Sequence, residues 1–230
     1  MNIDIRDQFL VAMDSNDLEK MRYLVDGCEL DFIVDAPTAL LPPGHVIPRL
    51  YIVERVILEN QIEMFKYLIR EGVLRYDVWQ FMLSFAIKHN RTTIIDIILN
   101  DVNEKFSHNY ALLLSIEYEN IPLAKKFIDE GSDVNMLSGY PLSAACNKGN
   151  SRLLCLLLES GAKVHSCQEE SIVYILVDRG DFYLIDVLVS YGWDISKVKN
   201  TTKYILAKKG FKTGIYKEGY SYALKVASKI

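Results

Sequence analysis

One segment near the carboxyl terminus has the glycine spacing of a phosphate-binding loop. Residues 214–221 read Gly-Ile-Tyr-Lys-Glu-Gly-Tyr-Ser. A P-loop requires a lysine directly after its second glycine, because that ammonium group neutralises the β- and γ-phosphates of a nucleotide. Here that position is Tyr220, and no apolar strand precedes the loop. The segment therefore does not predict nucleotide binding.

Three other residues have side chains of the types that bind zinc: His165, Cys167 and the more distant Cys155. A structural zinc site needs four ligands at recurring close spacing, and the chain has no Cys-x-x-Cys pair. We therefore expect no metal. His165 is interpreted as an exposed polar residue, and Cys146 and Cys155 as small core residues.

The sequence also lacks the motifs of hydrolytic enzymes. It contains neither the Gly-x-Ser-x-Gly pattern of a serine nucleophile nor the His-Glu-x-x-His pattern of a zinc protease. The acidic residues are spread along the chain, and nothing indicates that two of them share a pocket. The sequence predicts no catalytic residue, no cofactor and no enzymatic activity.

Composition indicates a folded intracellular protein. Of the 230 residues, 50% are hydrophobic and 24% are charged, whereas a disordered chain would be poorer in apolar residues. No run of 18 apolar residues could span a membrane, and the opening Met-Asn-Ile-Asp-Ile-Arg lacks the apolar core of a secretory signal. We expect a cytoplasmic protein that does not enter a membrane and whose four cysteines are thiols.

Charge is divided unevenly along the chain. Residues 197–230 contain nine lysines and one acid, a net charge of +8, so the first 196 residues carry about −12 of the total of −4. The lysines can solvate a terminal cap, bind an acidic protein, or bind nucleic acid or an anionic membrane, with interleaved tyrosines stacking on bases. We favour the cap. Nucleic-acid or polyanion binding through this lysine-rich segment is the alternative function.

A repeat of about thirty residues supplies the elements that would position any functional side chain. Four asparagines lie thirty residues apart, and a Gly-Asp pair continues the series: Asn60, Asn90, Asn120, Asn150 and Gly180-Asp181. About twelve residues later comes a second turn, which is a glycine in four of five copies: Gly72, Val102, Gly131, Gly161 and Gly192. Glycine and asparagine tolerate the left-handed conformation that ends a helix.

Apolar residues in helical register fill both intervals of the repeat. A first helix precedes each asparagine, for example at residues 79–88 and 140–146, and a second helix such as the one containing Leu156, Leu157 and Leu158 follows it. Each repeat is therefore predicted to be a helix, a tight turn, a second helix and a loop. We expect Asn60, Asn90, Asn120 and Gly149-Asn150 to lie in the tight turns.

An amino-terminal copy precedes this series, and an insertion separates the two. The copy has its tight turn at Asn16-Asp17 and ends at Gly27. The separation between Gly27 and Gly72 exceeds the repeat length by about 15 residues. The extra residues fall near positions 33–49 and include Pro37, Pro42, Pro43 and Pro48, which exclude a regular helix. The insertion is interpreted as a tolerated surface loop. A functional loop is the alternative.

The best-preserved copy resembles the ankyrin repeat. Residues 139–150 read Gly-Tyr-Pro-Leu-Ser-Ala-Ala-Cys-Asn-Lys-Gly-Asn, and residues 156–164 read Leu-Leu-Leu-Glu-Ser-Gly-Ala-Lys-Val. The family pattern is G-x-T-P-L-H-x-A-A-x-x-G-H, followed by a leucine-rich helix that ends in G-A-D-V-N. Residues 131–135, Gly-Ser-Asp-Val-Asn, also match that ending. The Thr-Pro-Leu-His motif survives only as residues 140–143, so the histidine bonding within that motif is absent.

The resemblance implies an all-α solenoid of about six to seven helix–turn–helix units. The repeat array covers residues 1–210, with the inserted loop near residues 33–49, and residues 211–230 form a cap with a helix at about 220–229. Repeats this short and degenerate resemble those of ankyrin proteins from large DNA viruses of amoebae. A viral protein of this kind would act on host proteins.

The resemblance also implies a protein–protein interaction module. The first helices and the loops would line a concave face, on which the residues before each tight turn contact the partner. Carried onto this sequence, the partner-binding residues are Glu59, Lys88, His89, Tyr118, Tyr140, Lys148, Arg179 and Lys208. The preceding residues, such as Val56, Ala86, Ser115, Ala145 and Leu176, should pack between helices. The partner is expected to be a protein, and neither its identity nor the oligomeric state is predicted.

Overall fold

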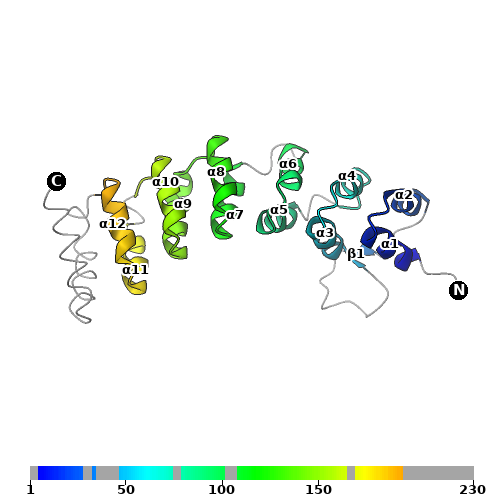
Figure 1. Ribbon diagram of the computed structural model, residues 1–230, viewed down its shortest axis with the longest axis horizontal. Helices are drawn as coiled ribbons and strands as arrows, with labels where there is room; N and C mark the ends of the chain where they lie inside the picture. Colours follow the sequence, from blue (N-terminus) through cyan, green and yellow to red (C-terminus); the bar gives the residue numbers. More distant parts are fainter. Residues whose placement is uncertain are drawn as a thin grey trace. The chain divides into compact units, whose positions relative to one another are not determined.

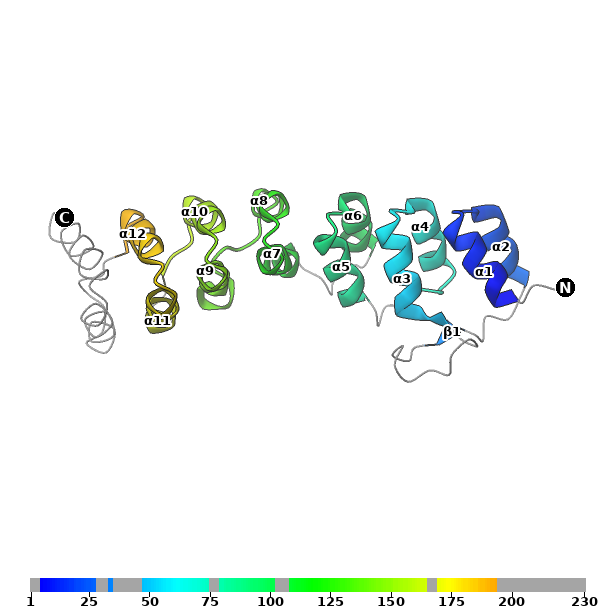
Figure 2. The same ribbon diagram turned by 60° about the horizontal axis from the view of Figure 1, so that its bottom comes forward.

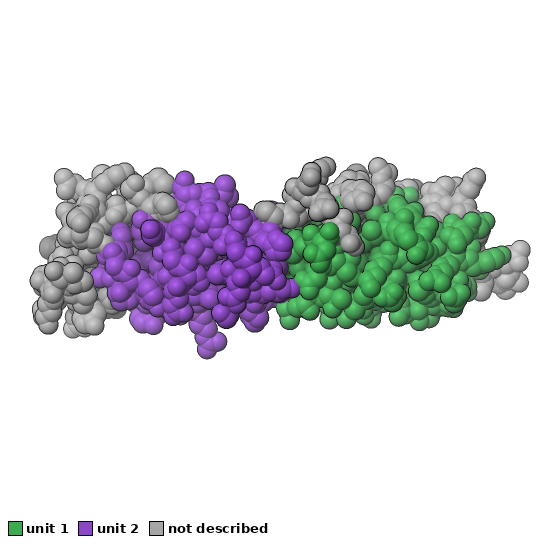
Figure 3. All heavy atoms as spheres, turned by 90° about the horizontal axis from the view of Figure 1, so that it is seen from above, with its two compact units in different colours: residues 1–107 green, residues 108–230 purple. Residues whose placement is uncertain are grey.

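The computed structural model describes residues 5–27, 33–34, 47–74, 79–101, 108–164 and 169–193. The chain divides into two compact units, residues 1–107 and residues 108–230 (Figure 3). Apart from two strands of two residues each, every regular element in these ranges is a helix. The prediction of an all-α chain is therefore confirmed.

The described residues form twelve helices that pack in adjacent pairs (Figure 1). The first unit contains α1 (Ile5–Asp14), α2 (Leu18–Gly27), α3 (Arg49–Leu58), α4 (Ile62–Arg70), α5 (Trp79–Lys88) and α6 (Thr92–Asp101). The second contains α7 (His108–Glu117), α8 (Ile121–Asp129), α9 (Met136–Lys148), α10 (Ser151–Glu159), α11 (Glu169–Arg179) and α12 (Phe182–Ser190). Each pair is a helical hairpin, as the repeat predicts.

Every hairpin turns on a single residue in the left-handed conformation. The six residues have φ between 53° and 76°: Asn16, Asn60, Asn90, Glu119, Gly149 and Gly180. Five are asparagine or glycine, which adopt this region at low cost, whereas glutamate at 119 is uncommon there. The predicted turn positions of Asn60, Asn90 and Gly149 are confirmed.

Two asparagines of the thirty-residue series have a different role. Asn120 and Asn150 come one residue after the left-handed residue and cap the second helix of their hairpins. Their side chains accept hydrogen bonds from the backbone N–H groups of Leu123 at 3.2 Å and Leu153 at 3.1 Å. The regular spacing of the asparagines therefore covers two adjacent structural positions, a left-handed turn and an N-cap.

Within each unit the first helices of the hairpins form one row and the second helices another (Figure 2). In the first unit α3 packs against α5 and α4 against α6, and in the second unit α9 packs against both α7 and α11. The five residues predicted to lie between helices are all fully buried, which confirms their placement: Val56, Ala86, Ser115, Ala145 and Leu176. The buried Ser115 hydroxyl donates to the Ala111 carbonyl at 2.8 Å.

The second helices of the first unit are also joined by a polar contact. The Tyr67 hydroxyl on α4 donates to the Asp26 carboxylate on α2 at 3.1 Å. Burial, with the carboxylate as a second cause, raises the pKa of Tyr67 to about 12. The phenol therefore remains a donor well into the alkaline range.

The two short strands lie at the ends of the predicted insertion. β1 (Ile33–Val34) pairs in parallel with β2 (Ile47–Pro48), so that Ile33 lies opposite Ile47. Arg49 follows directly and begins α3, and its guanidinium donates to the Val73 carbonyl. Residues 35–46 lie outside the described residues, as does the expected cap at 211–230.

The clearest test of the packing is Leu157 on α10, which is fully buried as expected. Leu157→Ala should lower the free energy of unfolding by about 2–5 kcal/mol, because it removes buried methyl groups and leaves a cavity. Chemical denaturation followed by circular dichroism would measure this loss. Arg152→Ala, at an exposed position of the same helix, is the control and should change stability little. An equal effect of both variants would contradict the packing described.

Candidate interaction surface

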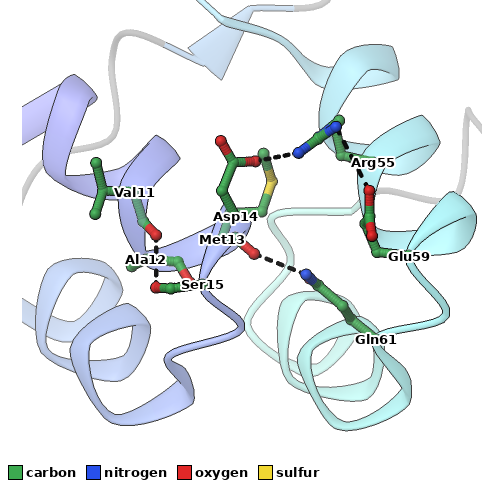
Figure 4. A network of polar contacts seen from close by, with 8 residues as sticks. All are labelled: Val11, Ala12, Met13, Asp14, Ser15, Arg55, Glu59 and Gln61. Carbon is green, nitrogen blue, oxygen red and sulfur yellow. Dashed lines mark hydrogen bonds and ion pairs between the residues drawn. The ribbon is translucent and has the colours of Figure 1, made fainter.

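In the first unit the predicted residue Glu59 belongs to an ion-pair network at the end of α3 (Figure 4). The Arg55 guanidinium lies 3.6 Å from the Glu59 carboxylate and 2.6 Å from the Asp14 carboxylate on α1. The hydrogen bond to Asp14 raises the pKa of Arg55 above its ordinary value. Glu59 is exposed, and its charge is partly balanced within the fold.

Beside this network, side chains of one hairpin bind the carbonyls that end the first helix of the preceding hairpin. The Gln61 amide donates to the Met13 carbonyl at 2.7 Å, as Figure 4 shows. Thirty residues later, Arg91 donates to the carbonyls of Ile57, at 3.1 Å, and Leu58. Gln61 and Arg91 both follow directly after a left-handed turn residue. The Met13 and Ile57 carbonyls also accept the N–H groups of Asn16 and Asn60, so these side chains add a second donor that links the two hairpins.

The other predicted residues of the first unit, Lys88 and His89, end α5. Lys88 is exposed, and His89 is half-buried with its ring tilted against Phe85 at a centroid distance of 4.4 Å. Phe85 in turn stacks on Phe81 at 5.7 Å. Residues four apart lie on one face of a helix, so three rings form an aromatic ridge along α5 that ends at His89.

In the second unit two predicted residues of α9 converge on α7. The Lys148 ammonium lies 2.9 Å from the Glu117 carboxylate, and the Tyr140 hydroxyl donates to the same carboxylate at 3.4 Å. Glu117 is therefore the centre of the cluster. Tyr118 follows it directly in the chain. Tyr118 and Tyr140 are 41% and 43% exposed, so both rings remain accessible beside the bound carboxylate.

Arg179 has a role inside the fold that sequence reasoning did not foresee. Its guanidinium donates to the carbonyls of Asn147 and, at 3.2 Å, Lys148, and lies 3.1 Å from the Asp181 carboxylate. It also fills the space beside Gly149, where a Cβ would lie 2.6 Å from a guanidinium nitrogen. Glycine at 149 thus meets two needs, a left-handed φ of 71° and room for Arg179.

A row of side-chain amides joins the loops of the second unit, and no site residue was predicted there. The Asn109 side chain accepts from the Asp133 N–H at 2.8 Å. Asn135 donates to the Gly161 carbonyl at 3.0 Å and accepts from the Lys163 N–H at 2.9 Å. The thirty-residue spacing of the Gly131 and Gly161 loops was visible in the sequence, but their bonding to each other was not.

The side chains described so far do not form a recognisable catalytic site. Burial raises the pKa of the Cys146 thiol to about 12, which disfavours the nucleophilic thiolate. Among the described residues no three His, Cys, Asp or Glu side chains gather closely enough to hold a metal ion. None of the helices in the described ranges is long and apolar enough to cross a membrane.

Several predicted features cannot be placed. Lys208, the eighth predicted partner-binding residue, lies outside the described residues. So do His165, Cys167, the lysine-rich segment beyond residue 197 and the loop at 214–221. Polyanion binding through that segment stays a prediction.

No protein-family model matches the chain, and no curated protein matches it in sequence.

The contacts of Arg179 predict a cost in stability. Arg179→Ala should lower the free energy of unfolding by about 0.5–1.5 kcal/mol, because two helix-end carbonyls lose their donor at a partly exposed site. Arg179→Lys should lower the free energy of unfolding by less than Arg179→Ala, because the lysine ammonium retains the charge. Some loss should remain, because an ammonium cannot reach both carbonyls as the planar guanidinium does. Thermal and urea denaturation would rank the three proteins. An alanine variant as stable as the wild type would show that these hydrogen bonds contribute nothing.

The two described cysteines should differ in reactivity. At pH 8 Cys146 should resist alkylation by iodoacetamide because it is buried and its thiol stays protonated. Cys155, which is half-buried, should be modified first. Peptide mass spectrometry after timed labelling would resolve the two sites, with urea-unfolded protein as the control in which both react. Equal rates in the folded protein would contradict the burial of Cys146.

Proposed function

We propose that this protein is an ankyrin-type helical repeat protein that binds another protein and has no enzymatic activity. The proposal is supported by helical hairpins about thirty residues apart, each turned on a left-handed residue, and by the Gly-x-x-Val loop endings at Gly131 and Gly161. Short and degenerate repeats of this type resemble those of large DNA viruses of amoebae. On that resemblance, the partner is a host protein.

The observation that carries the proposal is the cluster around Glu117. Lys148 and Tyr140 both bind this carboxylate, which fixes their side chains, while the rings of Tyr118 and Tyr140 remain more than 40% exposed. Binding energy in protein interfaces concentrates in a few such aromatic residues, and a side chain held in place loses less entropy when a partner binds. We define the interaction surface of the second unit as Glu117, Tyr118, Tyr140 and Lys148.

Charge favours a protein over a nucleic acid as the partner of this surface. The described residues of the second unit include eleven acids and six lysines or arginines. Nucleic-acid binding needs clustered cations that displace the counterions of the phosphates. An excess of acids over the described residues of this unit is unfavourable for a polyanion and compatible with a protein that presents polar and basic groups.

The proposal is tested by removing the two exposed rings. The variant Tyr118→Ala/Tyr140→Ala should lose capture of the partner from extracts of the source cells by at least about tenfold, as expected for aromatic hot spots. Its thermal stability should remain close to wild type, because both rings are largely exposed. Immobilised full-length protein and quantitative mass spectrometry would provide the measurement.

Tyr183→Ala is the matched control, since Tyr183 is 66% exposed on α12, in the row of second helices. This variant should retain the partner fully. A protein captured equally by wild type and the double variant binds elsewhere. If no protein depends on Tyr118 and Tyr140, the proposed surface is wrong.

A further inference from the structure

The amino-terminal end of α9 contains a non-helical segment that exposes a leucine on a strained backbone. Leu137, Ser138 and Gly139 are consecutive left-handed residues, with φ of 49°, 58° and 87°. Glycine adopts this conformation freely, but leucine and serine do so only at a cost in free energy. Leu137 is also 70% exposed, which makes it one of the most exposed large apolar side chains described. Folding alone would favour glycine or asparagine at this position, so the leucine requires another explanation.

The same unit contains a pocket of about 300 Å³ whose described lining residues are mainly apolar. Its described lining comes from the loops that follow α10 and α12 and from the ends of those helices, namely Leu158, Ala162, Lys163, Val164, Leu188, Tyr191, Gly192 and Trp193. A cavity of roughly 150 Å³ lined by aliphatic residues is large enough for benzene. This pocket can therefore accommodate a leucine side chain, and Lys163 is the charged residue in its described lining.

Leu137 and the pocket belong to neighbouring parts of one loop surface. Asn135, two residues before Leu137, binds the Gly161 carbonyl and the Lys163 N–H, and Lys163 lines the pocket. We propose that two copies of this chain form a dimer in which Leu137 of each copy enters the pocket of the other. In a dimer with a two-fold axis, both copies use the same surface patch. A protrusion and a pocket on one surface therefore allow each copy to insert its protrusion into the pocket of the other.

Charge agrees with a second copy as the occupant. The exposed Asp133 lies four residues before Leu137, whereas the exposed Lys163 lines the pocket. Two copies related by a two-fold axis bring the acidic loop of each toward the basic pocket of the other. The dimer is independent of the interaction surface around Glu117, because none of its residues belongs to that surface.

Sedimentation velocity of the full chain over a range of concentrations tests the dimer. Wild type should convert from monomer to dimer with a Kd on the order of 10–100 µM, as for a small interface. Leu137→Gly should raise this Kd by at least about tenfold. Its thermal stability should stay equal or increase, since glycine relieves the left-handed strain. Lost association together with unchanged or higher stability separates a contact residue from a structural one.

The pocket is tested from the other side with Val164→Lys, which places a charge among its apolar walls. Alone, this variant should be monomeric, as Leu137→Gly should be. Mixed together, the two variants should form a one-to-one complex, because one retains the pocket and the other retains Leu137. If Val164→Lys lowers thermal stability, Lys163→Glu replaces it and should weaken the dimer through its reversed charge.

Two control variants separate this inference from the proposed function. Tyr183→Ala and the Tyr118→Ala/Tyr140→Ala variant should dimerise like wild type, so failure of the proposed partner surface leaves this inference standing.

A wild-type chain that stays monomeric at several hundred micromolar, well above the expected Kd, would overturn the proposal. A dimer that survives Leu137→Gly would overturn it equally. Leucine-dependent binding to phosphatidylcholine vesicles without dimerisation would assign Leu137 to a lipid surface instead.

Discussion

In this protein, side chains of the neighbouring hairpin bind carbonyl groups at the ends of the first helices, and at two of these carbonyls they add to an N–H donor from the hairpin's own turn. Gln61 binds the end of α1, Arg91 the end of α3 and Arg179 the end of α9. The Met13 and Ile57 carbonyls also accept the N–H groups of Asn16 and Asn60, at 3.1 and 3.0 Å, so there the side chain is a second donor that comes from the next hairpin. Neighbouring hairpins are therefore joined by polar as well as apolar contacts.

The side chains at and near the ends of the first helices have two different roles. Arg179 has its donors directed into the fold, and its guanidinium fills the space beside Gly149, so it contributes mainly to the join between α9 and α11. Tyr118 and Tyr140 lie at the other extreme, because their rings are accessible while Tyr140 and Lys148 are oriented by Glu117. Residues that look equivalent in the sequence thus differ in how much of their surface is available to a partner.

The hairpins could be predicted from sequence because apolar periodicity and turn residues act locally. The bounds of α5 match the expected helix at 79–88, and the five residues assigned to the helix interfaces are buried. The asparagine series placed some of the turns one residue too late. Asn60 is itself the left-handed turn residue, whereas Asn120 is the N-cap that follows the turn, and asparagine is suited to both positions. The role of Arg179 could not be predicted, because it depends on carbonyls about thirty positions earlier that carry no signature in the sequence.

The paired strands at Ile33 and Ile47 have a consequence for how this chain can vary. Their pairing and the start of α3 at Arg49 fix both ends of the insertion. The entropy of closing a flexible segment between two fixed ends depends only weakly on the length of the segment. Doubling that length costs only about 0.6 kcal/mol. Lineages of this protein could therefore lengthen, shorten or exchange residues 35–46 while the hairpins on either side keep their register. The insertion is the place in the first unit where new sequence can be acquired with the least effect on the folded helices.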